Sequence, residues 1–158
     1  MGKTRLRFDG QLASDLRILQ AAEGSTWGSA YTDVQLLIEA LADYGDELEG
    51  HEHNSPSKPL LASRPWAVYT LRRTPPNEVA IQASAPPVLR IPYAWVKDDH
   101  DELYALVLFV ADKSDTQDQD QWYDDLASDV VKAVKAWLSN HPDHRIMTHE
   151  GLARRRSY

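Results

Sequence analysis

The chain has 158 residues, of which 42% are hydrophobic and 26% are charged, and its formal net charge at pH 7 is -7. This length favours a single domain, and the composition is that of a soluble globular protein with no segment apolar enough to span a membrane. The lack of cysteine excludes disulfides, thiolate catalysis and cysteine-based zinc sites, and the acidic balance argues against a non-specific nucleic-acid binder.

The N-terminal part reads as a short strand followed by a helix. The charged opening MGKTRLRFDG lacks the apolar run of a signal peptide, so we expect a cytoplasmic protein. Within it, RLRF alternates with a period of two, which predicts a strand with Leu6 and Phe8 pointing inward. Apolar residues then recur at helical spacing over residues 11–23, and Asp9 or Ser14 is placed to cap that helix.

A second helix is predicted over residues 31–44, followed by a loop. Gly45 stands where a helix stop is expected, and the Pro, Ser and Asn content of GHEHNSPSKP, residues 50–59, indicates a loop that joins the helices to a sheet. The helix is defined by one apolar stripe at i, i+3, i+4 and i+7, formed by Val34, Leu37, Ile38 and Leu41.

The remaining pattern predicts a sheet closed by a long helix. Residues 66–73, 88–96 and 103–110 read as strands, with 78–84 a weaker candidate, and the turn KDDHDE makes the last two an antiparallel hairpin. Pro92 lacks a ladder donor, so its strand should lie at an edge or carry a bulge. A final helix over residues 120–140 buries one side and ends at Asn140-His141-Pro142, the buried side comprising Trp122, Leu126, Val130, Val134, Trp137 and Leu138.

The predicted order is β-α-α-β-β-β-α, an α+β domain with two N-terminal helices, a small antiparallel sheet and a C-terminal helix. We place this single domain at residues 1–141 and a basic C-terminal tail at residues 142–158. The tail, THEGLARRRSY at its end, is interpreted either as a disordered basic end or as a contact for RNA or a partner.

Cations gather in the predicted sheet. Residues 58–97 hold six Lys or Arg against a single acid, whereas residues 98–129 hold eleven acids against one base, Lys113. Arg72, Arg90 and Lys113 lie at strand ends, and paired strands can bring such residues together as a phosphate site with Tyr123. Such a pocket would stabilise the charge of an in-line attack by a ribose 2′-hydroxyl. The alternative is that these side chains are solvated or pair with nearby acids.

Four segments carry a resemblance to a known family. They read ALADYGDELEGHEHNSPSKPL, WAVYTLRR, VLRIPYAWV and ALVLFVADKSDTQDQDQWYDDL. In this order and spacing they resemble the RelE/HigB toxins of type II toxin-antitoxin systems, particularly the phage-derived HigB-like branch. The resemblance spans residues 6–138.

The resemblance implies an endoribonuclease that cuts mRNA, usually on the ribosome, needs no metal or cofactor, and is silenced by a helix-turn-helix antitoxin. Arg72 and Arg90 would bind the scissile phosphate, Lys113 would share its charge or transfer a proton, and Tyr123 would stack on a base or orient the nucleotide. Further RNA contacts are expected from Lys58, Arg73, Trp122, His51 and His53, of which the two histidines would be the easier proton carriers.

Other interpretations stay open. The acidic residues beside the proposed site favour a second hypothesis, a non-catalytic RelE-fold module that binds a basic partner or mimics nucleic acid. A third is a domain that binds a small anionic ligand in the same pocket. His51-Glu52-His53 is a weak candidate for metal ligation, and the acidic turn at residues 98–102 is read as an exposed hairpin turn rather than a calcium loop.

Overall fold

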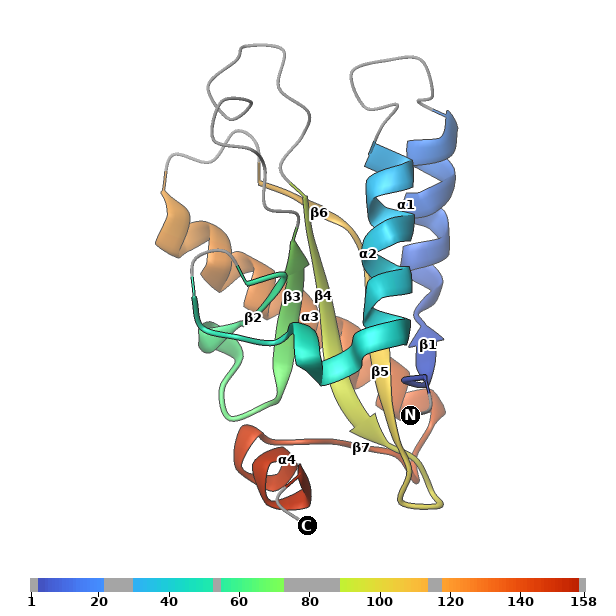
Figure 1. Ribbon diagram of the computed structural model, residues 1–158, viewed down its shortest axis with the longest axis vertical. Coiled ribbons are helices and arrows are strands. Elements are labelled where there is room, and N and C mark those ends of the chain that lie inside the picture. The colour runs from blue at the N-terminus through green and yellow to red at the C-terminus, as the bar shows by residue number, and fades with distance from the viewer. Residues whose placement is uncertain (1–2, 22–29, 53–54, 73–88, 114–117, 157–158) are drawn as a thin grey trace.

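The computed structural model describes residues 3–21, 30–52, 55–72, 89–113 and 118–156 (Figure 1). Within these ranges the strands are β1 (Leu6–Phe8), β2 (Ser57–Pro59), β3 (Val68–Arg72), β4 (Leu89–Lys97), β5 (Leu103–Val107), β6 (Ala111–Asp112) and β7 (Arg145–Ile146). The helices are α1 (Gly10–Ala21), α2 (Ala30–Tyr44), α3 (Gln119–Asn140) and α4 (His149–Arg156), with short 3-10 turns η1 (Gly45–Leu48) and η2 (Leu61–Ser63). The chain is therefore α+β.

The described strands form one mixed sheet in the order β1-β5-β4-β3-β2, with β6 and β7 also paired to β4. β1 runs parallel to β5, whereas the other strand pairs are antiparallel. The expected purely antiparallel sheet is therefore wrong. Strands β2, β6 and β7 were not predicted, and the candidate strand at residues 78–84 lies outside the described residues.

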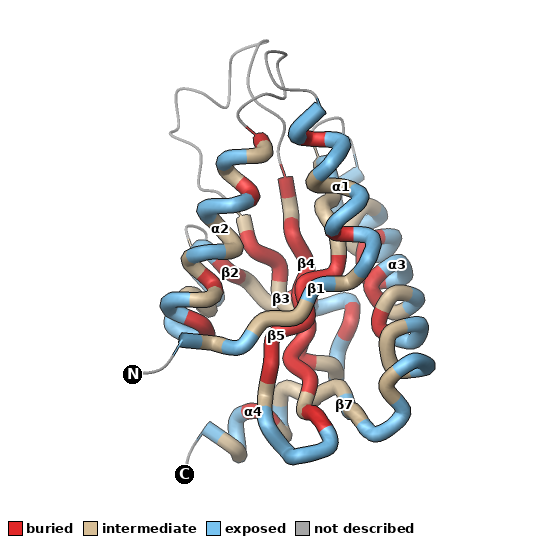
Figure 2. The backbone as a smooth tube through the Cα atoms, turned by 90° about the vertical axis from the view of Figure 1, so that its right-hand side faces the viewer, coloured by how far each residue is buried: buried red, intermediate tan, exposed pale blue. Residues whose placement is uncertain are grey.

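Helices cover both faces of the sheet, and β4 is buried between them (Figures 1 and 2). Along β4, Tyr93 and Trp95 belong to the core that includes α1, α2 and the α4 residue Leu152, while the alternating Ala94 and Val96 belong to the core beneath α3. The predicted stripes of α2 and α3 supply the facing side chains, which confirms both helices. Their fully buried members include Val34 and Leu41 from α2 and Val130 and Val134 from α3.

Pro92 lies in the middle of the sheet, so the expected edge position is wrong, and the bulge expected in its own strand lies instead in the segment that pairs with it. Tyr93 pairs with Val107 and Arg90 pairs with Ala111, so three residues of the neighbouring segment, 108–110, oppose two residues of β4. Leu108 N donates to Pro92 O over 3.1 Å. In an antiparallel strand the N and O of one residue point the same way, so the side where Pro92 lacks its donor faces the bulge.

The N-terminal helices begin and end at residues that the sequence marks. Gln11 N donates to the Asp9 carboxylate over 3.3 Å, so Asp9 rather than Ser14 caps α1. Gly45 follows α2 with φ +55°, a backbone conformation that favours glycine. Phe8 is 50% exposed, and its predicted inward orientation is therefore wrong.

The C-terminal segment is part of the fold. Ile146 pairs with Val96, and Leu152 on α4 is 1% exposed. Two of its basic side chains pair with acids, because Arg155 lies 3.2 Å from Asp101 and Arg156 lies 3.0 Å from Glu49. The interpretation as a disordered basic tail is therefore wrong, since sheet pairing and burial order this segment. Within the described ranges, no helix has the length and apolarity that crossing a membrane requires.

Candidate functional site

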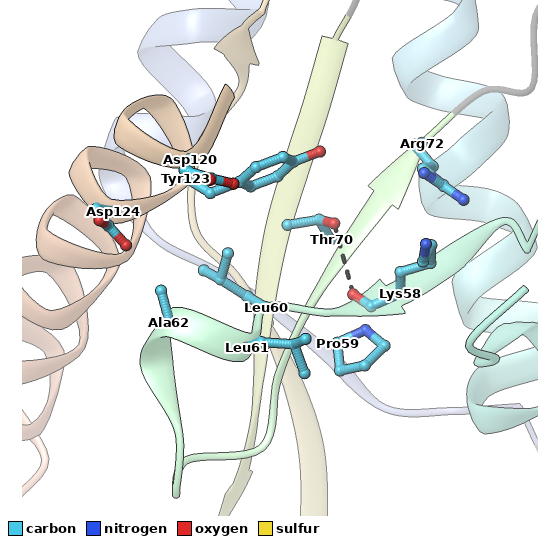
Figure 3. Close-up of a pocket in the computed structure, with 10 residues that line it drawn as sticks. All are labelled: Lys58, Pro59, Leu60, Leu61, Ala62, Thr70, Arg72, Asp120, Tyr123 and Asp124. Carbon is cyan, nitrogen blue, oxygen red and sulfur yellow. Dashed lines mark hydrogen bonds between the residues drawn. The ribbon is translucent and has the colours of Figure 1, made fainter. Parts of the chain in front are cut away.

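A pocket of about 510 Å³ lies between α3, the η2 turn and the strands β2 and β3 (Figure 3). Figure 3 shows cationic side chains on the strand side and acidic side chains on α3, with the Tyr123 ring reaching across between them. The pocket therefore carries both signs of charge. Its lining is Lys58, Pro59, Leu60, Leu61, Ala62, Thr70, Arg72, Asp120, Tyr123 and Asp124.

Arg72 is held at the end of β3, in direct register with Arg90 on β4. Its Nε donates to Ser55 O over 3.1 Å and its Nη2 to Glu52 O over 3.3 Å, which fixes the guanidinium beside the pocket. Burial lowers the pKa of Arg72, and the positive charge of Arg90 lowers it further, although Tyr123 acts in the opposite direction. Two guanidinium groups thus share one face of the sheet.

The Nε of Arg90 is a donor for which the described residues provide no acceptor. The Nη1 of the same side chain donates to Leu89 O over 3.0 Å, but the Nε is buried and has no hydrogen-bond partner in the described part of the chain. A buried donor left unpaired costs about 1 to 3 kcal/mol.

Tyr123 and Lys113 meet at the α3 side of the same cluster. Lys113 Nζ donates to the Tyr123 hydroxyl over 3.3 Å and lies 4.7 Å from the centre of its ring. Burial alone would raise the pKa of Tyr123, but hydrogen bonds and charge from Arg90 and Lys113 outweigh it, so the pKa lies below its usual value of 10.0. The cluster stabilises negative charge on the phenol oxygen.

The structure thus brings together the four residues that the sequence predicts as catalytic. Arg72 and Tyr123 line the pocket, Arg90 pairs across from Arg72, and Lys113 contacts Tyr123. They come from β3, β4, the residue after β6, and α3. Their convergence was expected from strand pairing, and the pairing of β3 with β4 provides it.

Of the other residues predicted to contact RNA, Lys58 is the one that the described structure places in the pocket lining. Trp122 packs against the core beneath α3 and meets the Tyr123 ring edge-on, with ring centres 5.1 Å apart, so it supports Tyr123 from outside the lining. His51 is exposed and is not a lining residue. Arg73 and His53 lie outside the described residues.

The sequence prediction missed three polar lining residues. Thr70 is two residues before Arg72 on β3 and therefore shares its face. Asp120 and Asp124 flank Tyr123 on α3 at helical spacing. The period-two and i, i+3, i+4 patterns place all three beside residues already singled out, so a signal for them was present.

The two other candidate sites from the sequence are the acidic turn at residues 98–102 and the possible metal ligands at residues 51–53. Asp98 Oδ1 accepts from the backbone N–H groups of His100 and Glu102 over 2.9 and 3.0 Å, so its carboxylate holds the hairpin turn together. In the described ranges, no group of three or more His, Asp or Glu side chains is placed to hold a metal ion. The metal interpretation of residues 51–53 includes His53, which lies outside those ranges.

Comparisons of the chain with protein-family models, with curated proteins and with solved structures found no match. What the pocket binds is therefore inferred from its own residues. The charged and phenolic groups of the lining are Lys58, Arg72, Tyr123, Asp120 and Asp124, around a cavity large enough for a small organic group. Arg90 stands in register with Arg72 and Lys113 contacts Tyr123, so two further cations lie beside the lining.

Proposed function

We propose that the protein is a RelE/HigB-like toxin, a metal-independent endoribonuclease that cuts mRNA in this pocket. The observation that carries the proposal is the convergence of Arg72, Arg90, Lys113 and Tyr123 from four separate segments. The elements β1, α1, α2, β3, β4, β5 and α3 also follow the order predicted from the sequence, with β2, β6, β7 and α4 as additions.

Two arginines would bind the scissile phosphate. Guanidinium groups recognise phosphate oxygens through paired hydrogen bonds, and Arg72, which lines the pocket, stands in register with Arg90 on the neighbouring strand. During in-line attack by the ribose 2′-oxygen, the phosphorus centre gains negative charge before the 5′-oxygen leaves. Arg72 and Arg90 would stabilise that charge more in the transition state than in the bound RNA, which accelerates the reaction.

Tyr123 is the group best placed for proton transfer. General acid-base catalysis favours a group whose pKa is moved toward the working pH, and the pKa of Tyr123 lies below its usual value. In its ionised form the Tyr123 oxygen would accept the 2′-hydroxyl proton, and the phenol so formed would return a proton to the departing 5′-oxygen. Lys113 holds the ring and stabilises the phenolate. His51, which is exposed outside the lining, has no part in this scheme.

The acidic lining favours a second candidate function. Asp120 and Asp124 form the α3 side of the pocket, and the chain carries a net charge of -7, so the backbone of a long RNA would be repelled from that side. A non-catalytic module that binds a basic protein partner would use the same acids. In the toxin proposal, the partners are instead mRNA on the ribosome and a helix-turn-helix antitoxin.

Induced expression distinguishes these candidates. We expect the wild-type chain to arrest growth and to cleave translating mRNA in the presence of a metal chelator. Arg90→Ala and Lys113→Ala should each lower the cleavage rate at least about 100-fold, since each removes a group that acts on the developing charge. Lys135→Ala is the matched control, because Lys135 is an exposed lysine on α3 outside the pocket lining.

The opposite result would favour the binding module. Wild-type protein that leaves growth and mRNA intact, and that forms a salt-sensitive complex with a basic protein, would overturn the nuclease proposal. A gene for a small helix-turn-helix protein directly beside this one would support the toxin-antitoxin pair.

A further inference from the structure

The α3 side of the pocket presents two carboxylates on one face. Asp120 and Asp124 flank Tyr123 at i, i+3 and i+4 spacing, and all three line the pocket across from Lys58 and Arg72 (Figure 3). Both acids are exposed, so both carboxylates are accessible to a ligand.

Two neighbouring acids, Asp118 and Asp125, already accept hydrogen bonds from Gln121. Asp118 caps α3 by accepting from Gln121 N over 3.1 Å, and Asp125 accepts from Gln121 Nε2 over 2.9 Å. Within the described part of the chain, no ion pair or side-chain hydrogen bond engages Asp120 or Asp124. The carboxylate oxygens of both lining acids are therefore available to a ligand.

An apolar surface lies next to these acceptors. The η2 turn contributes Leu61 and Ala62 to the lining, with Pro59 and Leu60 just before them, and Leu61 is 54% exposed although it is a large apolar side chain. The aromatic ring of Tyr123 borders the same space. Apolar and aromatic side chains are the usual contact surface for the flat face of a nucleobase.

The cationic side and the acidic side of the pocket suit different parts of a nucleotide. A phosphate is attracted to Lys58 and Arg72 and repelled by the carboxylates, so of the parts of a nucleotide the α3 side suits the neutral base, whose amino groups donate hydrogen bonds. Adenine and cytosine present an exocyclic amino group, and carboxylates accept from such groups, whereas the corresponding position of uracil carries a carbonyl oxygen that a carboxylate repels.

We propose, on the premise that the pocket binds RNA, that Asp120 and Asp124 form a base-recognition subsite that selects bases with an exocyclic amino group over uracil. Leu61 and Ala62 of η2, together with the Tyr123 ring, contact the face of the base, and the two carboxylates accept hydrogen bonds from its exocyclic amino group. The cavity of about 510 Å³ accommodates a single nucleotide. The pocket acids thereby determine specificity at one position, while the cations bind the phosphate of any sequence.

Binding of short, uncleavable oligonucleotides tests this subsite. Fluorescently labelled 2′-O-methyl oligomers of adenine, cytosine or uracil are titrated with wild-type protein, with the double variant Asp120→Asn/Asp124→Asn and with Asp125→Asn. We expect the wild type to bind the adenine and cytosine oligomers about 10-fold more tightly than the uracil oligomer. The double variant should reduce this preference to about 2-fold or less, because an amide can also donate to the uracil carbonyl.

Asp125→Asn is the matched control, since it removes the same charge from the same helix outside the pocket lining. Equal wild-type binding of all three oligomers would overturn the subsite and leave RNA binding intact. An equal loss of preference in Asp125→Asn would also overturn it, because bulk charge would then explain the effect. If no oligomer binds the wild type, the proposed function itself fails, and the subsite fails with it.

Discussion

Lys113 Nζ lies 3.3 Å from the hydroxyl oxygen of Tyr123 and 4.7 Å from the centre of its ring, so one lysine contacts both the polar tip and the face of the same phenol. The hydrogen bond and the cation-π contact both hold the lysine against Tyr123. Together with Arg90 they favour an ionised Tyr123. This pair forms the α3 side of the cluster whose strand side is Arg72 and Arg90.

Removing a cation from this cluster should make Tyr123 a weaker acid. In the wild type, the pKa of Tyr123 lies below its usual value of 10.0 because Arg90 and Lys113 outweigh the effect of burial. Lys113→Met or Arg90→Met takes away one of these charges, so the pKa of Tyr123 should rise. Its ionisation is followed by NMR of ¹³Cζ-labelled tyrosine over alkaline pH, with the signal assigned by Tyr123→Phe. Lys135→Met should leave the titration unchanged, and a response equal to that of Lys113→Met would contradict this account.

The hairpin turn should make folding stability depend on acidic pH. Hydrogen bonds from the backbone of Glu102 and His100, together with Arg5, lower the pKa of Asp98 from 3.8 to about 2, against the opposing effect of burial. Because this carboxyl has a lower pKa in the folded than in the unfolded chain, its ionised form stabilises the fold above pH 3.8, and that contribution is lost as the pH falls toward 2.

Urea denaturation at a series of pH values measures this effect. Asp98→Asn should lower stability at pH 7 and flatten the pH dependence over the interval in which Asp98 titrates. Asp99→Asn is the control, because Asp99 is the adjacent exposed acid. An identical pH profile for the wild type and Asp98→Asn would show that Asp98 contributes nothing.

The C-terminal helix should contribute to global stability. Leu152 is 1% exposed and lies in the same core as α1 and α2. Leu152→Ala would leave a cavity and lower the free energy of unfolding by about 2 to 4 kcal/mol, measured by chemical denaturation. Leu36→Ala serves as the control, because Leu36 is 57% exposed on α2 and its loss should cost about 0.5 kcal/mol or less. Equal stability of the wild type and Leu152→Ala would mean that α4 does not fold with the rest of the chain.

Local patterns in the sequence predicted the elements that depend on local physics. α2, α3 and the β4-β5 hairpin were identified because a helix repeats its buried side every three to four residues and an antiparallel hairpin needs only a turn. β7 and α4 were missed, since RI in β7 and HEGLARRR in α4 are short and polar and are ordered only by pairing with β4 and by burial of Leu152.

The candidate site likewise combines features that the sequence determines with features that only the tertiary structure decides. The sequence by itself determined which residues carry charge and a phenol, and that Arg72, Arg90, Lys113 and Tyr123 stand at the ends of elements. Only the tertiary structure decided that these four meet, because the direct pairing of Arg72 with Arg90 requires a register between strands that no local pattern encodes. It also decided that Asp120 and Asp124 face the pocket, since the direction of a helix face is set by packing of its apolar side against the sheet.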